Sequence, residues 1–207
     1  MKSTLIKGTD TWQPLCVYFS PANGDLLVGM FSYVEETCKV NRYNITGQYI
    51  QAIQHDNKGQ RLYRGPKYIV ENNNGDVIVS DFNQVVVTDD EGKYRFTYTG
   101  IPSGSLIPRG ICTDLLSHIL VCDHNTNTLH IIDKDGNLLS QILTRKQGLH
   151  TPYSVCYDNK THFLWVGSWE DNTVCVYKYL TRECCRTGTD VADQSNKFNT
   201  RKIFVNV

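Results

Sequence analysis

The sequence has no long hydrophobic run and no excess of charge of either sign. No stretch approaches the roughly 18 apolar residues of a membrane-spanning helix, and the start, MKSTLIKGTDTW, has no apolar core of a secretory signal. The 21 basic and 21 acidic side chains cancel, so the net charge does not draw the chain toward nucleic acid or an anionic membrane. We therefore expect a soluble, cytoplasmic protein with no membrane partner.

The sequence also has no CxxC pair, although it contains eight cysteines. Cys184 and Cys185 are adjacent, which is a poor geometry for chelating one ion. The other cysteines that bear on this question lie inside apolar strand-like runs, where cysteine behaves as a small hydrophobe: Cys16, Cys112, Cys122, Cys156 and Cys175. We expect free thiols, no metal site and no other cofactor.

One short strand-like run occurs four times along the chain. The copies are LLVGMF (26–31), VIVSDF (77–82), ILVCDH (119–124) and LWVGSW (164–169), and their starts differ by 51, 42 and 45 residues. A proline precedes each copy by 11 or 12 positions, at Pro14, Pro66, Pro108 and Pro152. Because two landmarks keep a similar spacing, the pattern predicts an array of repeats.

Each repeat reads as four short strands separated by Asn, Asp and Gly. In the third repeat these are RGICTD, HILVCD, TLHIID and LLSQIL, and no window offers an amphipathic helix with caps. Four strands in 40–50 residues predict an all-β fold, a β-propeller of four-stranded blades. We expect repeats near 10–60, 61–103, 104–147 and 148–180, an outer strand of a neighbouring blade at 3–8, and a flexible tail at 181–207, in which KIFVNV as an added strand is the less favoured alternative.

The third repeat resembles a known family. PRGICTD followed by HILVCDHNTNTLHIIDKDGNLL is similar to the NHL repeat, whose pattern is Pro-Arg-Gly-Ile-x-x-Asp, a strand, Asn, a second strand and an Asp-Gly turn. With WQPLCV, KGQRLY and LWVGSWEDNTVCVYKY, roughly residues 3 to 180 resemble the C-terminal propeller of invertebrate tripartite-motif (TRIM) proteins. The resemblance implies a non-catalytic module that recognises a protein partner or ubiquitination substrate, with RNA binding in post-transcriptional regulation as the alternative. No RING, B-box or coiled coil precedes the repeats, so ubiquitin-ligase activity is not implied for this chain.

The number of blades departs from the NHL family, whose propellers usually have six. The repeats here amount to about four blades, if Ser3–Gly8 supplies the missing outer strand of the last one. Two interpretations remain open. In the interpretation that we favour, the chain is a fragment of a six-bladed propeller and lacks about two of the blades. In the other, its four blades close into a ring.

Candidate binding residues fall at one end of the predicted blades. Four follow the second strand of their repeat (Phe31, Phe82, His124 and Trp169), and the basic or aromatic residues near the blade prolines are Arg64, Lys67, Arg109 and Tyr153. Aromatic rings beside arginines suit a peptide or unstacked RNA bases, although the same rings could instead pack between blades. Asp81 and Asp123 end strands before turns, and we expect them to cap turn N–H groups.

Catalysis is the less favoured alternative. Propeller lactonases and lyases hold a metal through carboxylates, Asn or His of the inner strands, whereas the residues after the blade prolines here include Lys67, Arg109 and Tyr153. His118, His130 and His162 lie at different phases of the repeat, so a shared metal cage is not expected. We therefore predict no catalytic residues and no small-molecule substrate.

Overall fold

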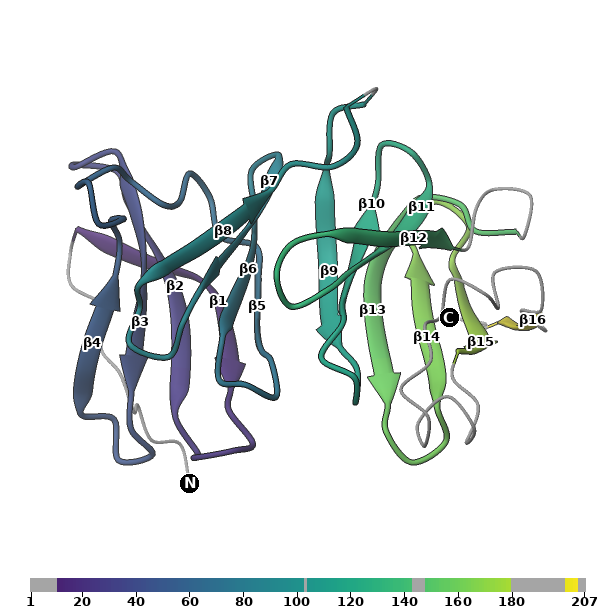
Figure 1. The fold of residues 1–207 in the computed structure, drawn as a ribbon, viewed down its shortest axis with the longest axis horizontal. Helices are drawn as coiled ribbons and strands as arrows, with labels where there is room; N and C mark the ends of the chain where they lie inside the picture. The colour runs from purple at the N-terminus through teal and green to yellow at the C-terminus, as the bar shows by residue number, and fades with distance from the viewer. Residues whose placement is uncertain (1–10, 103, 143–147, 180–199, 205–207) are drawn as a thin grey trace. The chain divides into compact units, whose positions relative to one another are not determined.

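The computed structural model describes residues 11–102, 104–142, 148–179 and 200–204. Within these residues it contains sixteen β-strands and no helix, so no helix there is long and apolar enough to cross a membrane (Figure 1). The strands form four antiparallel sheets of four strands each. The prediction of an all-β fold built from four-stranded blades is confirmed.

The first two sheets follow the first two repeats. Blade 1 contains β1 (Trp12–Phe19), β2 (Leu26–Ser32), β3 (Thr37–Tyr43) and β4 (Tyr49–Ile53), paired in that order. Blade 2 contains β5 (Tyr68–Glu71), β6 (Val77–Asp81), β7 (Gln84–Thr88) and β8 (Tyr94–Tyr98), again in chain order. Sequential antiparallel pairing is what a chain of hairpins joined by short turns produces.

The third and fourth sheets have the same order. Blade 3 contains β9 (Pro108–Thr113), β10 (Ile119–Asp123), β11 (Thr128–Ile132) and β12 (Leu138–Ile142). Blade 4 contains β13 (Pro152–Asp158), β14 (Phe163–Ser168), β15 (Thr173–Lys178) and β16 (Thr200–Phe204). The terminal segment therefore supplies a strand, which pairs with β15. We had expected Ser3–Gly8 to cover this edge; those residues, and 181–199 of the expected tail, lie outside the described part of the chain.

Many of the turns between strands are built around an Asp or Asn side chain. Asp114 Oδ1 accepts hydrogen bonds from the backbone N–H groups of Leu116 at 2.8 Å and His118 at 2.9 Å. The same pattern, two and four residues onward, occurs at Asn44, Asp56 and Asp133. These side chains satisfy backbone donors that the strands leave unpaired, which is why polar residues separate the apolar runs.

The chain divides into two compact units, each with its own core. Unit 1 comprises 1–71 and 75–97 and contains blade 1 and nearly all of blade 2; unit 2 comprises 72–74 and 98–207 and contains blades 3 and 4. The core of unit 1 includes Leu27, Val40, Ile69 and Val79. The core of unit 2 includes Leu120, Cys122, Leu164, Val166 and Tyr177. The second strands β2, β6 and β10 are almost wholly buried, as their apolar sequences predict, whereas β14 buries Leu164 and Val166 but leaves Trp165 exposed.

Candidate functional site

Unit 2 brings three of the predicted binding residues into contact at one end of its blades. The guanidinium carbon Cζ of Arg109 lies 5.4 Å from the centroid of the Tyr153 ring. The Tyr153 ring in turn lies 4.8 Å from the ring of Trp169, with their planes inclined by 32°. A cation against an aromatic face is an attractive contact. Arg109, Tyr153 and Trp169 thus form a continuous row, which we call the Arg–Tyr–Trp row.

The local backbone explains why these residues meet. Arg109 and Tyr153 each follow the proline that opens the first strand of a blade, β9 or β13. Trp169 directly follows β14, and its N–H donates to the carbonyl of Thr151 at 3.0 Å. This hydrogen bond closes the end of the blade and brings the residue after the second strand beside the residue after the proline.

Blade 3 repeats this closure. The N–H of His124 donates to the carbonyl of Ile107 at 3.1 Å, so His124 occupies in blade 3 the place of Trp169 in blade 4. The Nε of Arg109 and the Nδ1 of His124 are buried, and no hydrogen-bond partner for either atom occurs within the described residues. A buried polar group without a partner is costly, so this end of unit 2 retains hydrogen-bonding capacity that the described residues do not use.

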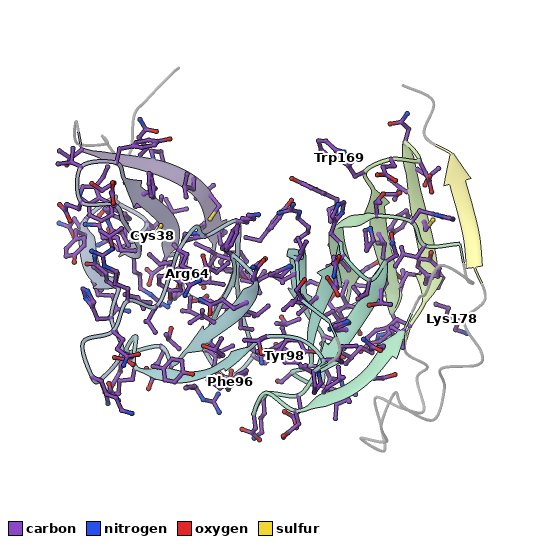
Figure 2. All side chains as sticks on the ribbon, turned by 90° about the horizontal axis from the view of Figure 1, so that it is seen from above. Cys38, Arg64, Phe96, Tyr98, Trp169 and Lys178 are labelled. Carbon is purple, nitrogen blue, oxygen red and sulfur yellow. The ribbon has the colours of Figure 1, made fainter. Side chains whose placement is uncertain are left out.

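Trp169, which is labelled in Figure 2, is 63% exposed, although the centroid of its ring lies 4.8 Å from that of the Tyr153 ring. Exposure of an ordered aromatic ring beside an arginine is a feature of binding surfaces, because the ring buries a large apolar area at little cost in side-chain entropy. The Arg–Tyr–Trp row therefore has the make-up of a recognition site.

The remaining predicted binding residues lie in unit 1. Phe82 directly follows β6 and is 53% exposed. Arg64 is exposed, and the N–H of Lys67 donates to the carbonyl of Ser80 at 2.8 Å. Phe31 differs from the expectation, because β2 continues through Ser32 and the Phe31 ring is partly buried against the core of unit 1. Its ring packs within the unit, where its centroid lies 4.5 Å from the centroid of the Tyr33 ring.

The two aspartates at the strand ends hold loop backbones in place. The buried carboxylate of Asp81 accepts hydrogen bonds from the N–H groups of Arg64 and Gly65, in the loop that precedes its blade. Asp123 Oδ1 accepts from the N–H of Ile107 at 3.0 Å and of Asn125 at 3.1 Å. Their carboxylates thus fix the loops that carry the candidate binding residues.

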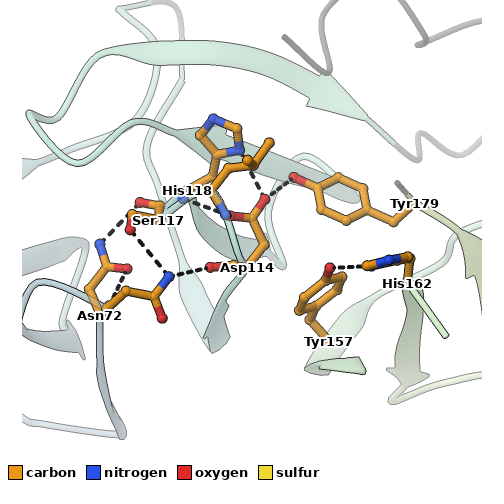
Figure 3. Close-up of polar contacts among 9 residues, drawn as sticks. Asn72, Asp114, Ser117, His118, Tyr157, His162 and Tyr179 are labelled. Carbon is orange, nitrogen blue, oxygen red and sulfur yellow. Dashed lines mark hydrogen bonds and ion pairs between the residues drawn. The ribbon is translucent and has the colours of Figure 1, made fainter. Parts of the chain in front are cut away.

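A further polar network in unit 2 was not anticipated from the sequence (Figure 3). Asp114 Oδ2 lies 2.9 Å from His118 Nδ1 and accepts a hydrogen bond from the Tyr179 hydroxyl at 2.9 Å. Burial, followed by the nearby Asp114 carboxylate, raises the pKa of Tyr179 well above its ordinary value, so this phenol stays a donor. The sequence signal was present, since Asp114 and His118 have the spacing of the Asx turns.

Within the described residues there is no group of three or more His, Cys, Asp or Glu side chains that could hold a metal ion. The six cysteines of that part of the chain are free thiols. Burial raises the pKa of the Cys16 thiol to about 11, so this thiol stays protonated at neutral pH.

No family model matches the chain, and no curated protein matches it. Solved structures do. A catalytically inactive variant of virginiamycin B lyase from Staphylococcus aureus, with quinupristin, is similar with a TM-score of 0.67 at 16% identity, over 98% of this chain and 59% of the lyase. The extracellular domain of a putative hybrid two-component system from B. thetaiotaomicron has a TM-score of 0.62 at 17% identity, over 92% of this chain and 24% of that one.

A putative gluconolactonase is similar with a TM-score of 0.56 at 18% identity, over 78% of this chain and 57% of that one. The chain thus spans less than two thirds of the length of each of these proteins. At such identities the likeness concerns the fold alone. Four four-stranded antiparallel sheets in chain order and these structural relatives together show that the chain has the β-propeller fold.

Proposed function

We propose that the chain is a non-catalytic recognition module, similar to the propeller of TRIM-NHL proteins, and that it binds a protein partner through the Arg–Tyr–Trp row. The observation that carries the proposal is the 63% exposure of Trp169 beside the Tyr153 ring and the Arg109 guanidinium. Tryptophan, tyrosine and arginine are the residues that most often dominate the energy of protein interfaces.

The resemblance to the NHL repeat supports this choice, because it covers the residues that build the site. Arg109 and Gly110 belong to the PRGI pattern, and His124 follows the second strand of the same repeat. In a TRIM-like protein the bound partner would be a ubiquitination substrate. The cytoplasm is the proposed location, and the free thiols of the described residues fit a reducing compartment.

RNA is the second candidate ligand, because an exposed ring packed beside another ring and a guanidinium also suits an unstacked base. Salt separates the two ligands. Contacts to phosphates release counterions, so the affinity for RNA falls steeply with salt concentration, whereas an interface centred on Trp169 and Tyr153 depends on apolar burial and responds less.

The test compares Arg109→Ala and Trp169→Ala with the unmodified chain. Each protein is used as bait in quantitative affinity purification, and the affinity of a recovered partner is measured by calorimetry at two salt concentrations. Each substitution is expected to cost about 1–3 kcal/mol of binding free energy, the typical loss at an aromatic or arginine anchor, with unchanged far-UV circular dichroism.

Asp135→Ala is the matched control, because Asp135 is an exposed turn residue of the same unit whose ion pair with Lys134 is on the surface. It is expected to leave binding unchanged. A partner that binds both site variants as tightly as the unmodified chain contradicts the proposal. Conversion of quinupristin by the chain, followed by mass spectrometry, would favour a catalytic function instead.

A further inference from the structure

In each unit the first blade packs on the second, blade 1 on blade 2 and blade 3 on blade 4, and the two blades contribute different faces to the contact. We call the face that a blade turns toward the following blade its forward face, and the opposite one its backward face. In unit 1 the forward face of blade 1 supplies Leu27 and Val40 to the core, and the backward face of blade 2 supplies Ile69 and Val79. In unit 2 the forward face of blade 3 supplies Leu120 and Cys122, and the backward face of blade 4 supplies Leu164 and Val166.

Small residues on the forward faces allow close approach. A Cβ added to Gly29 of blade 1 would lie 3.0 Å from Cβ of Pro66, which precedes blade 2. A Cβ added to Gly110 of blade 3 would lie 2.6 Å from Cα of Ser154 in blade 4. Charge also crosses the contact in unit 1, where Arg42 of the forward face lies 2.8 Å from the Glu71 carboxylate of blade 2. Forward and backward faces are therefore complementary surfaces.

The backward face of blade 1 is exposed along β1, although Val28 and Met30 of β2 on the same face are buried. The side chains of Val17 and Phe19 point to the same side of β1, and they are 67% and 56% exposed; Leu15, at the bulge of β1, is 49% exposed. Val17 lies opposite Val28 in the sheet, as Ile69 lies opposite Val79 in blade 2. Ile69, which blade 1 covers, is only 4% exposed. Within the described residues, blade 1 thus leaves Val17 exposed at the position where blade 2 buries Ile69.

The forward face of blade 4 is exposed on β13 and β14, whereas Val176 of β15, opposite Trp165, is buried. Trp165 lies opposite Cys156, as Leu27 lies opposite Tyr18 and Leu120 opposite Cys112 in the other blades. Leu27 and Leu120 are fully buried, whereas Trp165 is 39% exposed and Cys156 is exposed.

Gly167 repeats the position of Gly29 in the sheet. Within the described residues, a Cβ added to Gly167 would meet only Ser154 of its own blade. In the part of the chain that the structure describes, no residue therefore takes beside Gly167 the place that Pro66 takes beside Gly29.

We propose that copies of this chain associate head to tail, with the forward face of blade 4 of one copy packed on the backward face of blade 1 of a second copy. Among the described residues, blade 1 exposes apolar side chains on its backward face and blade 4 on its forward face, and the same two types of face mate inside both units. Both faces are apolar, and their burial in an interface is favourable. Such an interface is heterologous, since different surfaces of the two copies meet. This goes beyond the proposed function and does not use the Arg–Tyr–Trp row.

The test measures mass in solution by analytical ultracentrifugation of the full chain. The unmodified protein is expected to sediment as a species of at least twice the chain mass of 23.6 kDa. Val17→Glu and Trp165→Glu each place a charge in one face, and each is expected to raise the dissociation constant by about tenfold or more. Cys156→Glu repeats the change on the forward face at an exposed position, should Trp165→Glu fold poorly.

Val34→Glu is the matched control, because Val34 is 75% exposed but lies in the turn between β2 and β3 rather than on a blade face. It is expected to leave the mass unchanged. An equimolar mixture of Val17→Glu and Trp165→Glu is the decisive measurement. One intact forward face and one intact backward face remain in it, so the mixture is expected to form a complex of one copy of each with the affinity of the unmodified chain, although each variant alone associates more weakly.

Three results would overturn the proposal. A monomeric unmodified chain would mean that the faces are covered within one chain or not at all. Association that survives Trp165→Glu and Cys156→Glu but not Val17→Glu would mean that two backward faces pair symmetrically. An equal effect of Val34→Glu would mean that added charge, rather than loss of a face, prevents association.

Discussion

At the scale of single residues, the buried imidazole of His130 couples the stability of the protein to pH. His130 is fully buried; its Nδ1 lies 2.8 Å from the Tyr98 hydroxyl and its Nε2 lies 2.9 Å from the Gln141 amide. Burial lowers the pKa of His130 below its ordinary value, and the Asp123 carboxylate, 3.7 Å from Nε2, opposes this only in part. The native protein therefore holds a neutral imidazole.

The unfolded chain binds this proton at a higher pH than the folded protein does. The free energy of unfolding contributed by His130 is thus fully present above pH 6.5 and is lost as the pH falls from 6.5 toward the lowered pKa. For one proton the slope is at most about 1.4 kcal/mol per pH unit. Urea unfolding at a series of pH values checks this prediction.

In the His130→Gln variant this part of the pH dependence is expected to disappear, even if the variant is less stable at every pH. His55→Gln, which removes an exposed imidazole instead of the buried one, is the control and is expected to keep the slope. Equal slopes in the unmodified protein and in His130→Gln would show that another group titrates.

The sequence predicted positions of residues better than their contacts. It placed Arg109 and Tyr153 after blade prolines and Trp169 after a second strand, and the structure brings these three together. The repeat could not predict that Phe31 lies inside β2 and packs on the core, because strand length varies among the blades while the sequence pattern does not. A sequence also cannot show which buried polar atoms, such as Arg109 Nε, have no hydrogen-bond partner among the described residues, because this depends on which groups lie nearby in space.

At the scale of elements, the glycine of the PRGI pattern controls how closely two inner strands approach. A Cβ on Gly110 of β9 would lie 2.6 Å from Cα of Ser154 and 2.8 Å from N of Val155, both backbone atoms of β13. Backbone atoms cannot yield as the end of a flexible side chain can, so a methyl group here must separate the strands. Because Arg109 precedes Gly110 and Tyr153 precedes Ser154, the separation would reach the Arg–Tyr–Trp row.

Gly110→Ala is therefore expected to lower the free energy of unfolding by about 1–3 kcal/mol, the usual effect of overpacking a core, and to weaken ligand binding at the row as well. Urea unfolding gives the first quantity and calorimetry the second. Gly65→Ala is the control, because a Cβ at Gly65 would meet nothing within 4 Å. Equal stability of the two variants would mean that β9 and β13 can move apart without cost.

The order of the elements could be predicted because a period near 45 residues, with prolines and turn residues at fixed offsets, permits few folds. The outer strand of blade 4, β16, could not be predicted in the same way. An outer strand is covered on fewer sides than a second strand, so its apolar pattern is weak and it resembles a loop in sequence. The structure pairs β16 with β15, whereas the sequence favoured Ser3–Gly8 for the same edge.

At the scale of the whole molecule, charge balance and the exposed blade faces act in the same direction. The chain carries 21 basic and 21 acidic side chains and its isoelectric point is about 7.0. With no net charge, long-range repulsion between copies is absent at neutral pH, so apolar surfaces such as that of Val17 and Phe19 can meet freely. The global charge thus favours the proposed self-association in the same direction as the local surfaces do.

Net charge alone is therefore expected to change solubility and self-association. Lys58→Glu with Lys160→Glu replaces two positive by two negative charges at exposed turn positions, so the formal net charge at pH 7 falls from 0 to −4. Neither residue lies on a blade face.

We expect the double variant to be more soluble at pH 7 in low salt, and its dissociation constant for self-association to be higher than that of the unmodified chain. High salt should remove the difference, because it screens repulsion between charges farther apart than about 10 Å. Sedimentation at low and high salt measures both effects; a difference that persists unchanged in high salt would mean that Lys58 or Lys160 takes part in the interface directly.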